Sequence, residues 1–188
     1  TSFSYAGLAD FFALDTTDNS ESGPAVPAYI KSGAQFRWMT EVIPKSSARW
    51  KIPYFHHPPY CAGPRHAPAL LALRHFVDLF RANGVRVAFN GHEHNFQFSE
   101  ASEATGGIRY VITGAGGELR GGNALSRMRE AHIAGWAPAR HFLVVEIDGD
   151  TNAMPGPIDD PRSTVLAENS DAARGIDVNL RVICIGQV

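Results

Sequence analysis

The chain has 188 residues, of which 44% are hydrophobic and 10% aromatic. A chain of this size can bury a core without cross-links, which excludes a disulfide-stabilised miniprotein. Charged residues make up only 19% and the formal net charge is −2, so no basic field exists to hold nucleic acid or an anionic membrane. The composition therefore disfavours both classes of partner.

The sequence contains no apolar run near the roughly 18 residues that cross a bilayer, and we expect no membrane span. Its two cysteines, Cys61 and Cys184, belong to no zinc or redox motif, and they are either a disulfide or two buried thiols. The chain opens at Thr1 with no initiator methionine or signal sequence, which indicates a processed or fragmentary end. The cellular compartment stays open on these grounds.

The first third of the chain predicts a strand, a helix and a second strand. Residues 9–14 form a short aromatic run that ends in polar residues, as a buried strand does. Apolar positions from Gln35 to Ile43 follow helical spacing, and Pro44 should stop that helix. Residues 50–55 predict the second strand, which leads into a proline-rich loop beginning at His56.

The next segment predicts a crossover. A helix should start at Pro68 and close at Asn83-Gly84, and residues 85–89 should form a strand. A strand, a helix and a following strand in one sheet are nearly always parallel, so both strands end at the same edge. That edge is where open α/β sheets bind ligands. The two strands deliver four histidines to it: His56, His57, His92 and His94.

The remainder of the chain predicts further strands at residues 108–113, 141–147 and 181–185, with a short helix near 124–131. Residues 151–177 are rich in proline, aspartate and small side chains. Neither an internal repeat nor a linker that would separate domains is visible.

The histidines favour a metal site, although the pattern alone leaves a simpler alternative open. Neutral imidazole suits zinc, iron and manganese, and His92-Glu93-His94 presents two such rings from one loop. The alternative is that His92 and His94 face solvent or bond to the backbone. Of His56 and His57, at most one should point inward if the strand continues, because side chains alternate.

Three segments resemble the C-terminal half of the calcineurin-like metallophosphoesterases, and most closely their purple acid phosphatase branch. They are YFHHPPYCAGPRH, VRVAFNGHEHNFQ and IRYVITGAGG, and the stretches FFALDTT and QFRW are also similar to that family. The resemblance covers about the first 150 residues. It implies an α/β fold, a β-sandwich flanked by helices in αββα layers, of which residues 1–188 form the C-terminal part of one catalytic domain, with 151–188 as a tail.

The resemblance also implies a site with two metal ions, iron together with zinc, manganese or a second iron. His56 and His92 match ligands of the second metal, His94 matches a ligand of the first, and His57 occupies a variable position. His66 resembles a histidine that contacts phosphate in some members. The implied activity is hydrolysis of phosphate monoesters, with a phosphate ester as substrate, inorganic phosphate as product and export to the periplasm or the exterior as the favoured location.

The sequence departs from the family in its carboxylates. Relatives carry an Asp-x-His, a Gly-Asp and a Gly-Asn-His before the matched region, and this chain has none of them there. Because neutral imidazoles cannot offset two multivalent cations, a paired site needs a bridging anion. The missing ligands would then come from an upstream segment or a partner chain. Alternatively, the chain is catalytically silent or binds one metal, and within the superfamily a phosphodiesterase or nucleotidase fits equally.

Two carboxylates and a glycine-rich stretch near the expected edge have simpler roles. Asp15, at the tip of the first strand, is expected to cap its loop by bonding backbone amides. Glu93 should face outward or support a ligand. The glycines from Gly114 to Gly117 fit no phosphate-binding loop and predict a close-packed turn. The sheet should be one sheet of a sandwich, with a bare face or edge if an N-terminal half is missing.

Overall fold

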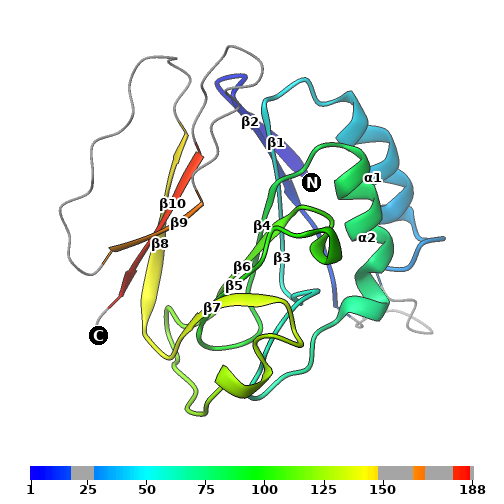
Figure 1. Cartoon of the computed structure of the whole chain (residues 1–188). Helices are drawn as coiled ribbons and strands as arrows, with labels where there is room; N and C mark the ends of the chain where they lie inside the picture. Colours follow the sequence, from blue (N-terminus) through cyan, green and yellow to red (C-terminus); the bar gives the residue numbers. More distant parts are fainter. Residues whose placement is uncertain (18–27, 148–162, 168–179, 187–188) are drawn as a thin grey trace.

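The computed structural model describes residues 1–17, 28–147, 163–167 and 180–186. Two α-helices, two short 3₁₀-helices and ten strands occupy these ranges (Figure 1). In chain order they are β1 (Ser2–Tyr5), β2 (Ala9–Ala13), α1 (Ala34–Lys45), β3 (Trp50–Phe55), α2 (Leu70–Ala82), β4 (Val87–Asn90), β5 (Phe96–Ser99), η1 (Glu103–Thr105), β6 (Arg109–Thr113), η2 (Leu125–Arg127), β7 (Ile133–Ala137), β8 (His141–Ile147), β9 (Ser163–Ala167) and β10 (Leu180–Gly186).

The larger sheet has seven strands in the order β1-β2-β3-β4-β6-β5-β7. Its centre is parallel: β2 pairs with β3, β3 with β4, and β4 with β6 in parallel register, whereas the outer strands are antiparallel. The predicted crossover from β3 through α2 to β4 is therefore confirmed. The carboxyl ends of β3 and β4 lie next to each other, with Phe55 opposite Asn90.

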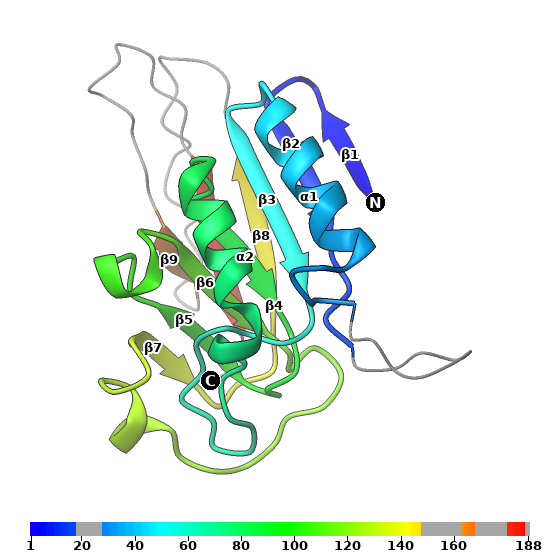
Figure 2. The same cartoon turned by 90° about the vertical axis from the view of Figure 1, so that its right-hand side faces the viewer.

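Both helices cover one face of this sheet (Figure 2). Helix α2 buries an apolar stripe at helical spacing, Leu73, Phe76, Val77 and Phe80. Helix α1 buries Met39 and Ile43. These side chains share one apolar cluster with residues of the sheet such as Phe12 and Tyr110.

The other face of the large sheet carries a second sheet of three strands, in the order β8-β10-β9 (Figure 1). A second apolar cluster joins the sheets: Leu143 and Ile147 of β8 pack against residues of β2 to β6 that include Trp50 and Val111. The layers are helices, large sheet and small sheet, which confirms the α/β fold; within the described residues the α-helices cover one side of the sandwich. The expectation that the chain supplies one sheet is wrong, because β8 and β10 pair with each other rather than with the large sheet.

Several elements differ from the sequence-based expectation. Pro44 lies inside the last turn of α1 rather than beyond its end. Residues 124–131 contain only the 3₁₀ turn η2 instead of a helix. Strands β1, β5, β7 and β9 were not expected, and β7 depends on Gly135, where a Cβ atom would lie 2.1 Å from the ring of Phe98.

Strand β1 forms one edge of the large sheet and is exposed, with Phe3 at 54% and Tyr5 at 62%. Cys61 is a buried free thiol, whereas the side chain of Cys184 lies outside the described part of the structure. Most of 151–188 lies outside it too. Neither described α-helix has the length and hydropathy that a bilayer span requires.

Candidate metal centre

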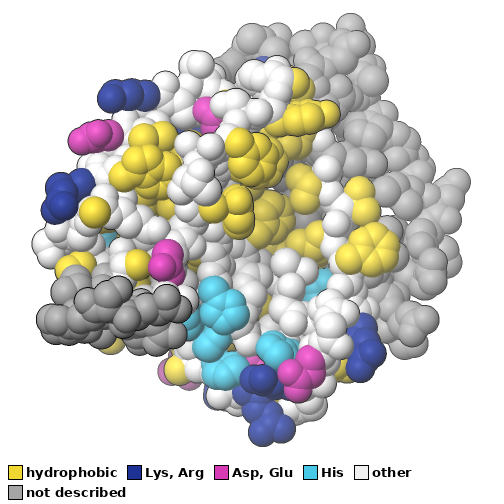
Figure 3. All heavy atoms as spheres, turned by 180° about the vertical axis from the view of Figure 1, so that it is seen from behind, with side chains coloured by type: hydrophobic (Ala, Val, Ile, Leu, Met, Phe, Trp, Pro, Cys, Tyr) yellow, Lys and Arg dark blue, Asp and Glu magenta, His cyan; other side chains and the backbone are white. Residues whose placement is uncertain are grey.

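The candidate site lies at the carboxyl edge of β3 and β4. His56 directly follows β3, and His92 lies two residues beyond β4. The two loops are joined by a hydrogen bond from Gly91 N to His56 O of 3.0 Å. Figure 3 shows histidine side chains gathered in one patch of the surface, with acidic and basic side chains beside them. The predicted convergence of both histidine-bearing loops is confirmed.

The loop after β4 turns within three residues. Glu93 N donates to Gly91 O at 2.8 Å, and the residue between them, His92, has φ of +69°. A three-residue turn around a positive φ at a non-glycine residue is rare and strained, and such strain concentrates at functional sites. The turn is packed from both sides, because a Cβ on Gly91 would lie 3.3 Å from His56 Nδ1 and one on Gly114 would lie 2.2 Å from Glu93 O. The close-packed turn predicted after β6 is thereby confirmed at Gly114.

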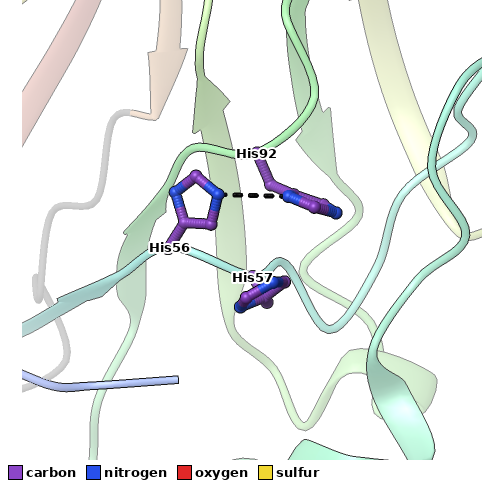
Figure 4. A group of neighbouring side chains, drawn as sticks. All are labelled: His56, His57 and His92. Atoms are coloured by element: carbon purple, nitrogen blue, oxygen red, sulfur yellow. Dashed lines mark hydrogen bonds between the residues drawn. The ribbon is translucent and has the colours of Figure 1, made fainter. Parts of the chain in front are cut away.

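Three imidazoles meet at this turn: His56, His57 and His92 (Figure 4). Each offers one nitrogen, and these atoms lie within 4.8 Å of one another. His56 Nε2 and His92 Nδ1 are hydrogen-bonded at 3.1 Å. The rings of His57 and His92 have centroids 4.5 Å apart. Both His56 and His57 contribute, contrary to the expected alternation, because the chain leaves the extended conformation after Phe55.

The geometry and the charge state of these rings suit a transition-metal ion. Burial and the neighbouring imidazoles lower the pKa of His92 to about 4. The pKa of His56 is lowered as well, chiefly by burial and then by His57. Both rings are therefore neutral near pH 7 and carry the lone pair that a metal needs. The 3.1 Å between these two nitrogens also matches the separation of two ligand atoms that both bind the same ion at about 2.0–2.1 Å.

Thr16, just beyond β2, holds the third ring. The backbone N of His57 donates to Thr16 Oγ1 at 3.0 Å, and the same oxygen lies 3.0 Å from His57 Nδ1. The contact engages Nδ1 of His57 and leaves Nε2 as the nitrogen available to a metal ion. Orientation of a metal-binding histidine through its other nitrogen is the usual arrangement. Sequence analysis did not single out Thr16, because nothing local marks a threonine that bonds to a residue 41 positions away.

The two remaining predicted site residues occupy different surroundings. The ring of His66 packs against that of His92, with centroids 4.0 Å apart. His94 stands outside the group of three, with its Nδ1 3.1 Å from Glu118 Oε2, and Glu118 in turn lies 3.6 Å from Arg120. The structure therefore brings His56, His57, His66 and His92 together and directs His94 toward a carboxylate that the sequence analysis missed.

The two carboxylates near the site have the supporting positions expected of them. Asp15 Oδ1 accepts hydrogen bonds from Thr17 N at 2.8 Å and from Thr17 Oγ1 at 2.7 Å, and these bonds lower the pKa of Asp15. It caps its loop, as predicted. Glu93 is fully buried and accepts from His66 N at 2.8 Å, so it supports a site residue and does not face outward.

Two curated relatives match the chain. Purple acid phosphatase 17 of Arabidopsis thaliana is 30% identical over 125 residues, which cover 59% of this chain and 36% of that protein. Purple acid phosphatase 3 of the same plant is 24% identical over 154 residues, covering 76% of this chain and 41% of the relative. The matches support the purple acid phosphatase branch. The chain spans about two fifths of the length of these relatives.

Solved structures share the fold. Purple acid phosphatase PPD1 from yellow lupin (Lupinus luteus) seeds superposes with a TM-score of 0.58 at 14% identity, covering 76% of this chain and 27% of that one. The structure of PhoD gives a TM-score of 0.54 at 16% identity, with 74% and 34% covered. The family model of the calcineurin-like phosphoesterases matches residues 3–96, which contain β2, β3, β4 and the five histidines of the loops after β3 and β4. The chain belongs to the calcineurin-like phosphoesterase family.

Proposed function

We propose that the protein hydrolyses phosphate monoesters at a dinuclear metal centre, and that this chain supplies the histidine ligands. The observation that carries the proposal is the group of His56, His57 and His92 at the carboxyl edge of two parallel strands. Family membership and the purple acid phosphatases among the relatives support the reaction class.

In this proposal His56 and His92 hold the second metal ion and His94 holds the first. His57, whose Nε2 is left available by Thr16, is a further candidate for the second ion. When bound, a pair of ions supplies positive charge to the phosphate oxygens and lowers the pKa of a reacting water. The ions would be iron with zinc, manganese or a second iron. His66, beside His92, would contact the phosphate of the substrate and of the product.

The carboxylate ligands of such a centre would come from outside this chain. Two multivalent ions close together need bridging anions, and the group of three possible ligands in the described residues consists of imidazoles alone. The curated relatives are more than twice as long as the part matched here, which leaves room for an upstream segment. A partner chain is the other source. Because the sequence resembles the purple acid phosphatases, we propose that the intact protein is exported from the cytoplasm.

A second candidate, a single-metal or catalytically silent module, rests on His94. Its Nδ1 lies 3.1 Å from Glu118 Oε2 and outside the group of three. This contact leaves Nε2 of His94 free, but His94 belongs to no group of three possible ligands within the described residues, so this chain offers the first metal a single imidazole. The histidine group would then bind one ion without turnover.

Metal content and turnover separate these candidates. The intact protein is expected to contain two metal ions and to hydrolyse a chromogenic phosphate monoester, and His92→Ala should abolish turnover while Glu41→Gln, on the exposed face of α1, should not. One ion without turnover would support the silent module. Faster hydrolysis of a chromogenic diester or of a nucleotide than of the monoester would replace the monoesterase proposal by a phosphodiesterase or nucleotidase.

A further inference from the structure

A buried polar face follows the proposed metal ligands along the chain. Glu93, Asn95 and Gln97 alternate with His92, His94 and Phe96, and their exposed fractions are 0%, 1% and 0%. Residues 92–95 are bends that lead into β5, so the three side chains are grouped by the loop they contact and not by strand alternation. We call these three residues the 93–97 polar face. Burial of three polar side chains is unfavourable unless each is hydrogen-bonded.

All three side chains bond to the loop that carries His66. Gln97 Oε1 accepts from Ala62 N at 2.9 Å, and Gln97 Nε2 donates to Gly63 O at 2.7 Å. Asn95 Nδ2 donates to the same carbonyl at 3.1 Å. Arg127 Nη2 donates to Pro64 O at 3.1 Å. The loop is therefore held along its length by side chains rather than by a sheet or a helix.

Glu93 holds the end of this loop. Its Oε2 accepts from His66 N at 2.8 Å and lies 3.3 Å from His66 Nδ1, which is ion-pair distance but outside hydrogen-bond geometry. The backbone contact is thus the defined one. Glu93 Oε1 makes no hydrogen bond within the described residues. A fully buried carboxylate is costly to keep, so its one well-formed bond to His66 indicates a specific role.

We propose that Glu93 is a positioning residue: its carboxylate, with Asn95 and Gln97 fixing the preceding loop, holds the His66 ring against His92, where it can contact substrate phosphate. The inference rests on the proposed function, because it gives His66 the phosphate as its partner. Glu93 lies in the sequence between the proposed ligands His92 and His94, and in this role it touches neither metal nor substrate. The loop runs ten residues from His56 to His66, and a loop of that length samples many conformations unless it is held.

Two substitutions distinguish the effect of the length of the Glu93 side chain from the effect of its charge. Glu93→Gln keeps an oxygen at the same distance and removes the charge, whereas Glu93→Asp keeps the charge on a side chain one carbon shorter. Because the proposed contact is to a backbone N–H, Gln should retain positioning better than Asp. Glu93→Ala removes both properties. Glu41→Gln is the matched control, since it removes one exposed carboxylate on α1.

The first measurement is the affinity of the metal-loaded intact protein for inorganic phosphate. Glu93→Asp and Glu93→Ala should weaken it about tenfold, the order expected for loss of a hydrogen bond to a charged group, and Glu93→Gln by less than about threefold. His66→Ala should show the same loss, and the double variant Glu93→Ala/His66→Ala should lose no more than His66→Ala alone. Metal content should be unchanged in every variant.

The second measurement is hydrogen exchange of the His66 backbone amide, which requires neither metal nor activity. Exchange should accelerate in Glu93→Asp and stay slow in Glu93→Gln. Three outcomes would overturn the positioning role. The exchange rate of the His66 amide could be unchanged in Glu93→Asp, or the losses of phosphate affinity could add up in the double variant. The third is that Glu93→Asp keeps slow exchange and phosphate affinity better than Glu93→Gln does. Failure of the unaltered protein to bind metal or phosphate would instead overturn the proposed function, and the exchange result would still decide whether Glu93 holds His66.

Discussion

The loops that follow β3 and β4 lie side by side and hold their histidines by different means. The loop after β4 turns at once, and its own backbone defines it through the bond from Glu93 N to Gly91 O around His92. The loop after β3 has no such internal turn at its histidines. His57 is held by Thr16, and His66 is held by Glu93.

This contrast separates what local sequence determines from what distant residues determine. The tight turn after β4 is closed by a backbone bond between two residues that flank His92, and the backbone at Gly114 packs against it. The orientation of His57 depends on a residue 41 positions earlier, and that of His66 on one 27 positions later. We therefore expect substitutions that push the backbone apart to disrupt the loop after β4. Substitutions that remove a side-chain hydrogen bond should disrupt the loop after β3.

The largest effect is expected at Gly114, which tests the backbone-defined loop. In Gly114→Ala the added Cβ would lie 2.2 Å from Glu93 O, and neither backbone can move without displacing the turn. We expect a loss of about 3 kcal/mol of unfolding free energy, at the upper end of overpacking effects, together with loss of metal binding. Chemical denaturation and metal analysis measure both. Gly117→Ala is the control, because its Cβ would meet nothing within 4 Å, and an equal loss there would contradict the argument.

The next largest effect is expected when one histidine of each loop is replaced and the zinc affinity is measured by titration. His92→Ala should weaken zinc affinity of the intact protein at least about 100-fold, since removing a ligand costs more than the 10–100-fold of a supporting residue. His57→Ala should cost about tenfold, because His57 occupies the variable position. A loss at His57 as large as at His92 would contradict its variable role and make His57 a full ligand. An unchanged affinity in His92→Ala would remove it from the ligand set.

Thr16→Val tests the loop that depends on side chains. Valine keeps the shape of threonine but cannot bond to His57, whose backbone N–H would lose its acceptor. We expect a loss of about 1–2 kcal/mol in stability and up to about tenfold in zinc affinity. Thr40→Val, on the exposed face of α1, removes a hydroxyl bonded only within its own helix and should change neither. Equal effects of the two substitutions would show that Thr16 does not orient His57.

The same contrast explains how far the sequence predicts the fold. Strands β3 and β8 agree with their expected bounds, and α2 and β4 lie within about two residues of theirs, because periodicity and flanking prolines and glycines define them locally. Strands β5 and β7 were missed because they are short and depend on each other: the Phe98 ring occupies the space that Gly135 leaves. That β8 and β10 form a separate sheet depends on pairing between residues far apart in the chain.

The candidate site divides in the same way. Topology alone brings His56 and His92 to one edge, because parallel strands joined by a helix end together. It does not predict that His57 also turns inward, since this requires Thr16, or that His94 faces Glu118 24 positions later in the sequence. The ligand roles of these residues stay predictions that the metal titrations test.

The smallest effect concerns Asp15, which caps the loop that carries Thr16. Bonds from Thr17 hold the pKa of Asp15 below its ordinary value, so ionised Asp15 stabilises the folded state above the unfolded pKa of about 3.9, and this contribution is lost as the pH falls through the folded value. Because the side chain is exposed, we expect less than about 1 kcal/mol. Thermal unfolding of Asp15→Ala should therefore differ from the unaltered protein by a constant amount above pH 5 and by less below about pH 4. A difference that grows on acidification would mean that Asp15 is stabilised in its protonated form and does not cap the loop as an anion.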